Sequence, residues 1–456
     1  MSLLQCLTTL PHEITIVSSP SGSRTIGQLL EYARSHGSKL QGRRVALRLA
    51  DPVAGIEAMV ALDGQAESIT LLPTAISDNH LSALIEKARC DLLLASERQT
   101  SPHVSQASSI EIASGLDGLY GVSEKGFAYT RETRWHLATS GTTNVPKLVA
   151  HTFGSLSRTV KLKSSTRSEA SWGLLYDYMR FAGLQVVFQA ILSGSRLIAC
   201  SQELPLRDRI AALVMHGCTH LSATPTLWRA ILMTPGASQL PLRQITLGGE
   251  IADERILEKL KAAYPDARVT HIYASTEAGV GFSVKDGKPG FPVSYLTKPP
   301  ADFELRLVDG RLHIRNPGVI ATYVGTNDPF GTDDGWIDTG DNVECVGDRI
   351  FFLGRASGVI NVGGNKVHPE EVERLLLSHP VVQEARVFGK PSSIVGAIVV
   401  ADIVLAHAPQ DPTALRAEIK AYLRARSESY KVPSMLNLVD AIETTATGKL
   451  SRGTSQ

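Results

Sequence analysis

Short runs of apolar, β-prone residues alternate with amphipathic stretches through the first half of the chain. Such runs predict strands, and apolar residues at helical spacing predict a helix between them. The strands are expected at Val45–Leu49, Leu92–Leu94, Arg196–Ala199 and Gln244–Leu247, with a helix at Ser82–Lys87. Because strands alternate with helices, this part of the chain predicts an α/β fold with layered sheets.

The pattern changes after Pro299, where short alternating runs replace the longer segments. Phe303–Val308 and Arg311–Arg315 are expected to be strands, and Asp309-Gly310 between them is a hairpin signal. We therefore expect a small β-rich subdomain at about 300–354.

The last hundred residues predict a separate α+β unit. A helix is expected from about Pro369, a strand near Val381–Phe388, and a second helix from Asp411. The second helix would carry Leu415, Ile419, Tyr422 and Leu423 on one face, as an amphipathic helix against a core does.

Composition narrows the function only slightly. The 456 residues include 46 basic and 45 acidic side chains, a net charge of +1, so no broad field for nucleic acid is present. The chain can bury a large core and is expected to form at least two domains. Its five scattered cysteines argue against both a disulfide framework and a zinc site. No apolar stretch is long enough for membrane insertion, and we expect a cytoplasmic protein.

A hydroxyl-rich segment directly follows the apolar Leu137-Ala138. It contains Thr139, Ser140, Gly141, Thr142, Thr143 and Lys147. Hydroxyls and the backbone N–H groups of a glycine turn can wrap a polyphosphate, while the lysine offsets its charge. A Walker A loop is unlikely because Pro146 precedes the lysine and Leu148 follows it. A polar surface turn is the alternative for this segment alone.

A second polar segment follows the β-prone Val269–Ile272. Its residues are Tyr273, Ala274, Ser275, Thr276 and Glu277. An aromatic ring can lie on an adenine, a threonine hydroxyl can reach a phosphate, and a carboxylate can hold magnesium. The alternative is a capped helix N-terminus after a strand.

A third segment places Gly335 and Gly340 around a strand-like stretch, with Asp341 expected after a turn. Such a carboxylate can accept hydrogen bonds from both ribose hydroxyls. The neighbouring Asp333 and Asp334 support the alternative of an acidic surface turn.

Two further segments lie toward the C-terminus. After Gly354-Arg355, Val359–Val362 predicts a strand, Gly363-Gly364 a turn, and Pro369 the first position of a helix. Thr447–Arg452 alone is typical of a solvated basic tail.

These five segments, in this order, resemble the motifs of the adenylate-forming superfamily. Acyl-CoA synthetases, aryl-acid ligases, luciferases and peptide-synthetase adenylation domains belong to it. The resemblance covers most of the chain and is weakest before residue 135. It implies ATP-dependent activation of a carboxylic acid to an acyl-adenylate with release of pyrophosphate, followed by transfer to a thiol. ATP, Mg²⁺ and coenzyme A are the expected cofactors and co-substrate.

The resemblance also implies roles for single residues. Lys449 would be catalytic, entering the site during adenylation to bridge the carboxylate and the α-phosphate. Glu277 would hold the metal, Asp341 the ribose, and Arg355 the ribose or phosphate. Gly248, Gly249 and Glu250 match the segment that runs between adenine and substrate.

The same resemblance implies the domain plan. Residues 1–354 would form the adenylation domain, 355–358 a hinge, and 359–456 a small mobile domain that swings between the two steps. Asn144 and Ala274 stand where glycine is usual, and Ala356-Ser357-Gly358 replaces the usual acidic pair. Asn144 and the altered hinge motivate an alternative from another class, a non-catalytic nucleotide-binding scaffold.

The sequence says least about the acid substrate and the thiol acceptor. The resemblance implies an acid pocket lined by Trp172, Tyr176, Tyr178, Arg180, Phe181 and Gly183, whose aromatic rings could hold an aryl acid. No Asp stands where relatives that activate amino acids anchor the ammonium group, which favours an aryl or fatty acid over an amino acid. The alternative is that this aromatic stripe is plain core. The expected thiol-acceptor turn comprises Gly363, Gly364 and Lys366. Coenzyme A is the expected acceptor, a carrier protein's phosphopantetheine is the alternative, and a homodimer remains open.

Overall fold

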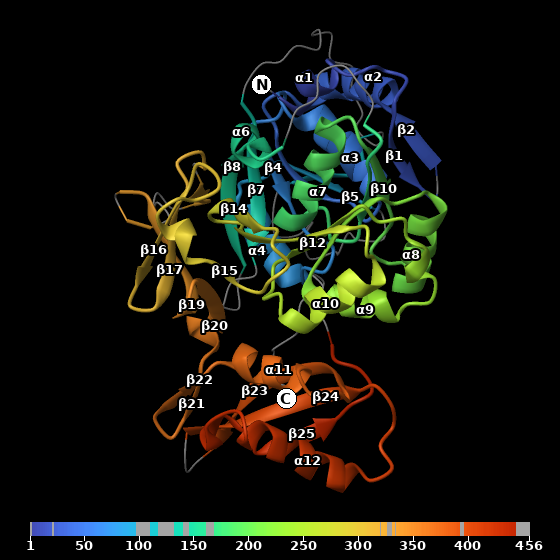
Figure 1. The fold of residues 1–456 in the computed structure, drawn as a ribbon. Helices are drawn as coiled ribbons and strands as arrows, with labels where there is room; N and C mark the ends of the chain where they lie inside the picture. The colour runs from blue at the N-terminus through green and yellow to red at the C-terminus, as the bar shows by residue number, and fades with distance from the viewer. Residues whose placement is uncertain are drawn as a thin grey trace.

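The computed structural model describes residues 2–20, 22–96, 110–116, 132–139, 146–160, 168–319, 321–325, 331–332, 334–392 and 396–443. A large upper part and a smaller lower part are visible in Figure 1, joined near the end of β20. The expected α/β class is confirmed, with layered sheets, a β-rich sheet and a small C-terminal α+β unit.

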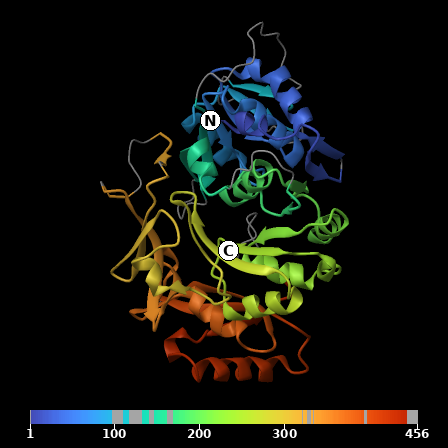
Figure 2. The ribbon, with the colours of Figure 1, turned by 45° about the horizontal axis from the view of Figure 1, so that its top comes forward.

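Two large sheets form the upper part (Figure 2). The first has the order β18-β8-β7-β4-β3-β5-β6, and the second has the order β14-β13-β12-β11-β9-β10-β1-β2. Neighbouring strands run parallel, except for the antiparallel pairs β18–β8, β8–β7, β14–β13 and β1–β2. The strands of the first sheet are Thr322–Tyr323 (β18), Lys147–Thr152 (β8), Arg134–Thr139 (β7), Ser68–Leu71 (β4), Arg44–Arg48 (β3), Leu92–Ala95 (β5) and Glu111–Ala113 (β6). Those of the second are Gly279–Val284 (β14), Arg268–Ser275 (β13), Gln244–Gly248 (β12), His220–Ala223 (β11), Ser171–Leu174 (β9), Arg196–Ala199 (β10), Thr15–Ser19 (β1) and Gly22–Thr25 (β2).

Two helices pack between these sheets. Helix α3 (Pro52–Leu62) and helix α7 (Phe181–Leu192) are apolar on almost every side, and a helix of that kind must be buried. Both belong to the largest core cluster, which also contains Leu47 and Leu71 of the first sheet and Val17 and Leu197 of the second. The other α-helices that the structure describes in the upper part are Leu3–Leu7 (α1), Ile26–His36 (α2), Asp78–Lys87 (α4), Phe153–Ser157 (α6), Leu206–Met215 (α8), Pro225–Met233 (α9) and Glu254–Ala263 (α10).

A separate antiparallel sheet has the order β15-β20-β19-β17-β16. Its strands are Phe291–Pro292, Arg349–Arg355, Trp336–Val346, Arg311–Arg315 and Glu304–Val308 in that order. The predicted hairpin is present, and its turn residues Asp309 and Gly310 both have positive φ, 50° and 72°. The sequence had suggested that Asp341 follows a turn, but it lies inside β19.

The C-terminal unit has a sheet of order β22-β21-β24-β23, with β25 beside β24. These strands are Asn365–Val367, Ile360–Val362, Gly396–Leu405, Val382–Ser392 and Met435–Leu438, and the helices are α11 (Pro369–Leu377) and α12 (Pro412–Arg424). Asp411 caps α12 by accepting a hydrogen bond from the Thr413 N–H at 2.8 Å. The sequence did not predict β22, which turns the Gly363-Gly364 bend into a hairpin.

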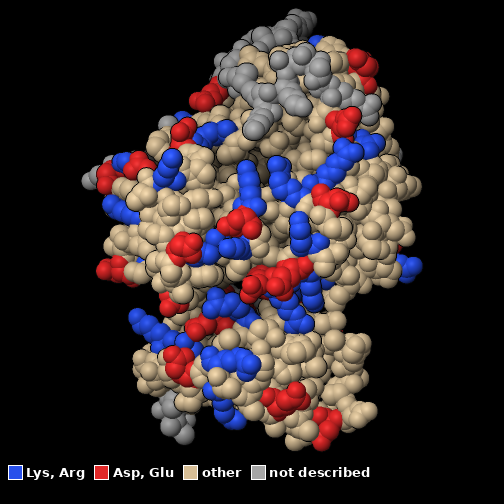
Figure 3. Space-filling model, in the orientation of Figure 1, with Lys and Arg blue, Asp and Glu red and all other residues tan. Residues whose placement is uncertain are grey.

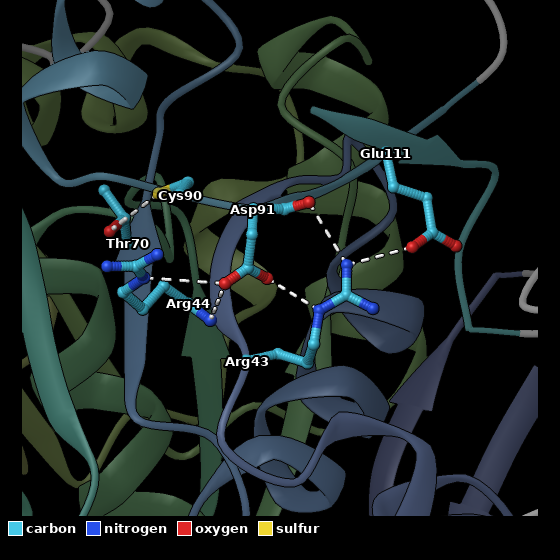
Figure 4. A network of polar contacts seen from close by, with 6 residues as sticks. All are labelled: Arg43, Arg44, Thr70, Cys90, Asp91 and Glu111. Atoms are coloured by element: carbon cyan, nitrogen blue, oxygen red, sulfur yellow. Dashed lines mark hydrogen bonds and ion pairs between the residues drawn. The ribbon is translucent and has the colours of Figure 1, made fainter. Parts of the chain in front are cut away.

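A polar network at the amino ends of β3, β5 and β6 fixes their register (Figure 4). The Arg43 Nε donates to Asp91 Oδ1 at 2.6 Å, and its Nη2 reaches Glu111 Oε2 at 2.9 Å. The Arg44 backbone N–H donates to the other Asp91 oxygen at 3.1 Å. One carboxylate therefore joins two neighbouring strands.

A second set of polar contacts lies deeper in the core, around the buried His136 on β7. Its Nδ1 lies 3.1 Å from Thr70 Oγ1, which also accepts from the Cys90 thiol. Because the Thr70 hydroxyl accepts from the thiol, its own proton is free to point at His136, which suits a neutral imidazole. Burial, and then the charge of Arg134, lowers the pKa of His136 from 6.5 to about 4.

We predict that His136→Asn makes the free energy of unfolding depend less on pH between 6.5 and about 4. Between pH 6.5 and about 4 the folded His136 binds fewer protons than the unfolded one, so its contribution to stability is lost as the pH falls. That contribution amounts to about 3 kcal/mol by the acid end of the window. Denaturant unfolding at several pH values measures the slope, with the exposed His12→Asn as control. Equal slopes in both variants would contradict the prediction.

Candidate functional site

A cavity of about 310 Å³ lies where the second large sheet, the β-rich sheet and the C-terminal unit meet. It brings together residues from three of the five predicted segments and from the Gly248–Glu250 stretch. Those that line it are Gly249, Glu250, Tyr273, Ala274, Asp341 and Arg355. Acidic and basic side chains also gather at the waist between the two parts on the face in Figure 3.

Strand ends position the residues of this cavity. Gly248 ends β12 beside Ile272 of the parallel β13, and β13 continues through Tyr273 to Ser275. Gly249 and Tyr273 therefore lie near the carboxyl ends of neighbouring strands. Asp341 and Arg355 are register partners on the antiparallel strands β19 and β20. Residues far apart in the chain therefore meet at the cavity.

Asp341 is the centre of the polar contacts in the cavity. Its Oδ2 accepts a hydrogen bond from the Tyr273 hydroxyl at 2.6 Å, and its Oδ1 lies 2.7 Å from the Arg355 Nε. Arg355 also donates to the Thr339 carbonyl at 3.0 Å. The carboxylate is thus held in a fixed orientation by two donors.

The aromatic wall beside Asp341 is built around Tyr273. Its ring stacks with Phe282 and Phe352 at centroid distances of 5.2 and 5.3 Å. Burial, and next the negative charge of Asp341, raises the pKa of Tyr273 well above its usual value. The hydroxyl therefore remains a donor, and the stacked rings supply a flat apolar surface suited to a purine.

Glu250 closes the side of the cavity next to α9. Its Oε2 accepts from the Thr226 N–H at 3.0 Å, in the first helical turn, where a carboxylate is favoured by the helix dipole. Gly249 has a φ of 81°, a conformation that favours glycine. Gly248 ends β12 and is not among the lining residues.

The residues expected to face the phosphates lie near β8. Thr139 ends β7 and pairs with Lys147 at the start of β8, so the ends of the hydroxyl loop are fixed. The Lys147 Nζ lies 4.8 Å from the centroid of Tyr323. Ser140, Gly141, Thr142 and Thr143 lie outside the described residues.

His151 links β8 to the turn that carries Thr276 and Glu277. Its Nε2 lies 2.7 Å from the Thr276 carbonyl oxygen and its Nδ1 3.1 Å from the Ser155 hydroxyl. A carbonyl only accepts, so Nε2 carries the proton and Nδ1 accepts from Ser155. Burial lowers the pKa of His151 to about 4, which keeps this neutral arrangement at physiological pH.

Glu277 suits a magnesium ion that arrives with ATP. It lies in the turn between β13 and β14, half-buried, and its charge acts on Tyr323, whose pKa is raised first by burial and then by Glu277. No group of three or more metal-binding side chains occurs among the described residues. Magnesium retains waters and binds substrate phosphates, so one carboxylate is a fitting protein contribution.

The expected acid-pocket residues do not line this cavity. The Tyr178 hydroxyl donates to the Leu49 carbonyl at 2.5 Å inside the core, and Phe181 lies 6.1 Å from the His151 ring. Trp172 packs 4.9 Å from the His220 ring. Tyr176 is buried, and its pKa is raised by that burial and then by the charge of Glu250, which lines the cavity.

Two members of that set shape the start of α7. The Arg180 Nε lies 3.7 Å from Asp177 Oδ2, and both side chains are largely buried. A Cβ on Gly183 would lie 2.1 Å from the Asp177 carbonyl oxygen, so only glycine fits there.

The expected acceptor turn lies away from the cavity. Gly363 and Gly364 have φ values of 57° and 88° in the turn between β21 and β22, and Lys366 is exposed. None of these lines the cavity. Lys449 lies outside the described residues.

One face of α11 lines the cavity, and it was not predicted from the sequence. Its members are Glu370, Glu373, Arg374 and Leu377. Their i, i+3, i+4, i+7 spacing would have placed them on one side of a helix, but nothing local indicated what that side covers.

Comparison with known protein families assigns the chain to one of them. The AMP-binding enzyme family matches residues 11–324, and the AMP-binding enzyme C-terminal domain matches residues 371–449. The chain belongs to the AMP-binding enzyme family. In its described residues, no helix has the length and apolar character needed to cross a membrane.

Relatives in this family include CoA ligases. The chain is 26% identical over 441 residues to 2-succinylbenzoate–CoA ligase of Bacillus velezensis, covering 90% of the chain and 87% of that relative. It is 25% identical to human mitochondrial acyl-coenzyme A synthetase ACSM2B, covering 69% of the chain but 59% of that relative.

Solved structures share the fold over nearly the whole chain. An anthranilate CoA ligase in complex with anthranoyl-AMP superposes with a TM-score of 0.82 at 20% identity, covering 99% of the chain and 95% of the ligase. An o-succinylbenzoate CoA synthetase of Bacillus subtilis gives 0.78 at 22% identity, covering 98% and 96%.

We predict that Asp341→Asn weakens nucleotide binding. The amide offers the Tyr273 hydroxyl and Arg355 an acceptor but loses the charge and one acceptor oxygen, so the affinity for AMP should fall about tenfold or more. Isothermal titration calorimetry measures this loss. Glu304→Gln, on the β-rich sheet away from the cavity lining, is the matched control, and equal affinities in both variants would contradict the ribose role.

Proposed function

We propose that the protein is an AMP-forming carboxylic acid–thiol ligase. The observation that carries this proposal is the convergence of Tyr273, Asp341 and Arg355 on one cavity, in a chain whose relatives include CoA ligases. The first step would join an acid to AMP, and the second would transfer the acyl group to a thiol.

In the first step, a carboxylate oxygen of the acid attacks the α-phosphorus of ATP, and the bond to pyrophosphate breaks. Asp341 would hold the ribose, and Lys147 with the hydroxyl loop would face the departing pyrophosphate. Magnesium held at Glu277 would neutralise phosphate charge. Lys449 would stabilise the charge that develops between the acid and the α-phosphate, an electrostatic effect worth several kcal/mol.

In the second step, a thiol sulfur attacks the acyl carbon, loses its proton, and AMP departs. We propose a domain boundary at 355–358, where the short 3₁₀ segment Ala356–Gly358 follows β20. Rotation there would move the C-terminal unit from its position in the first step to its position in the second. Gly363, Gly364 and Lys366 would then face the thiol.

For the substrate we propose an aryl acid bound beyond Glu250, near Tyr176. A 2-succinylbenzoate–CoA ligase is among its relatives, and an anthranilate CoA ligase and a benzoate CoA ligase share its fold. We propose coenzyme A as the acceptor.

The proposal predicts acid-dependent exchange of pyrophosphate into ATP. A panel of aryl, fatty and amino acids, assayed with magnesium, should yield exchange with at least one aryl acid. The same panel with coenzyme A and with a phosphopantetheinylated carrier protein identifies the acceptor. Absence of exchange with every acid would favour a nucleotide-binding scaffold instead.

We predict that Lys449→Ala separates the two steps. Exchange should fall by about a hundredfold or more, because a positioned cation contributes several kcal/mol to the first transition state. Thioester formation from a supplied acyl-adenylate should change little. Equal losses in both steps would contradict the role of Lys449.

A further inference from the structure

Arg255 connects the upper part of the molecule to the C-terminal unit. It lies in the first turn of α10, and its guanidinium donates to backbone carbonyls that follow it by 122 to 127 positions in the chain. Nη1 donates to the carbonyl of Leu377, to that of His379 at 2.8 Å and to that of Val382 at 3.0 Å. Nη2 donates to the Pro380 carbonyl at 3.1 Å.

The acceptors of Arg255 mark the end of α11 and the turn into β23. The last carbonyls of a helix have no partner within the helix and form the negative end of its dipole. A guanidinium supplies several N–H donors in a planar fork, so one side chain can satisfy several such carbonyls. A lysine at this position would offer a point charge without that geometry.

The helix that Arg255 holds also covers the cavity. Glu370 and Leu377, near its two ends, both line the cavity opposite Tyr273 and Asp341. At the amino end, a Cβ on Gly354 would lie 2.0 Å from the Glu370 Oε2, so the helix approaches β20 closely there. At the carboxyl end Arg255 makes the contact. The present position of α11 is therefore fixed at both ends.

We propose that Arg255 is the clamp that sets the orientation of residues 359–443 over the cavity. This inference rests on the proposed two-step ligase function. Rotation about 355–358 would carry the carbonyls of Leu377 to Val382 away from α10, so the contact exists in one orientation and must break to reach another. A contact made in only one of two states shifts their populations by its own free energy. Arg255 would thereby set the balance between the two steps.

A distance measurement tests the clamp without catalysis. Nitroxide labels at Met215→Cys on α8 and Arg424→Cys on α12, in a Cys345→Ser background, report the separation of the two parts; both labelled positions are exposed. We expect one narrow distance population in the parent, and a broadened or second population after Arg255→Ala. Lys261→Ala, an exposed position on the same helix, should match the parent. Identical distributions for Arg255→Ala and Lys261→Ala would overturn the proposal.

The two half-reactions give a second readout. Arg255→Ala should change the ratio of the adenylation rate to the thioester-forming rate by about fivefold or more, as expected for losing hydrogen bonds to a charged group. Arg255→Lys should give an intermediate ratio, and both variants should keep the parent's circular dichroism spectrum. Equal changes in both rates, or none, would overturn the proposal. If no acid is activated even by the parent, the ligase function fails, and the distance measurement alone still decides whether Arg255 is a clamp.

Discussion

The Asp341 carboxylate joins parts of the fold that the chain order keeps apart. It lies on the β-rich sheet, accepts from Tyr273 of the second large sheet, and pairs with Arg355 at the last position of β20. Because the carboxylate is buried, removing either donor would leave negative charge with less compensation. The same contacts that orient the carboxylate for the proposed ribose also hold the two sheets together beside the C-terminal unit.

The rigidity behind this arrangement comes from the large sheets. The apolar core around α3 and α7 joins the two sheets. A second apolar cluster packs Ile245 and Leu247 of β12 with α9 and α10, so the end of β12 is held by a core rather than by a loop. His151 extends that support to the Thr276 carbonyl, next to the proposed magnesium ligand. The proposed two-step reaction needs a small unit that moves over a fixed base, and Arg255 lies where the upper part contacts the C-terminal unit.

Local sequence signals predicted much of this fold. Arg196–Ala199 and Arg311–Arg315 were predicted with their observed bounds, and Asp411 was predicted as a helix start. Each depends on neighbours within a few positions: β-prone runs, a turn of positive φ, or a capping carboxylate. The strand β22 was missed because its three residues carry no apolar pattern and pair only through the hairpin.

The sequence by itself determined the family, the order of its motifs and the residue types able to bind a nucleotide, since these depend on chemistry written locally along the chain. Only the tertiary structure decided which of them share a cavity, that Tyr178 belongs to the core, and that one face of α11 closes the site. Those outcomes depend on strand register and on packing between distant segments, such as Arg255 with the end of α11. No spacing within either segment encodes such a contact.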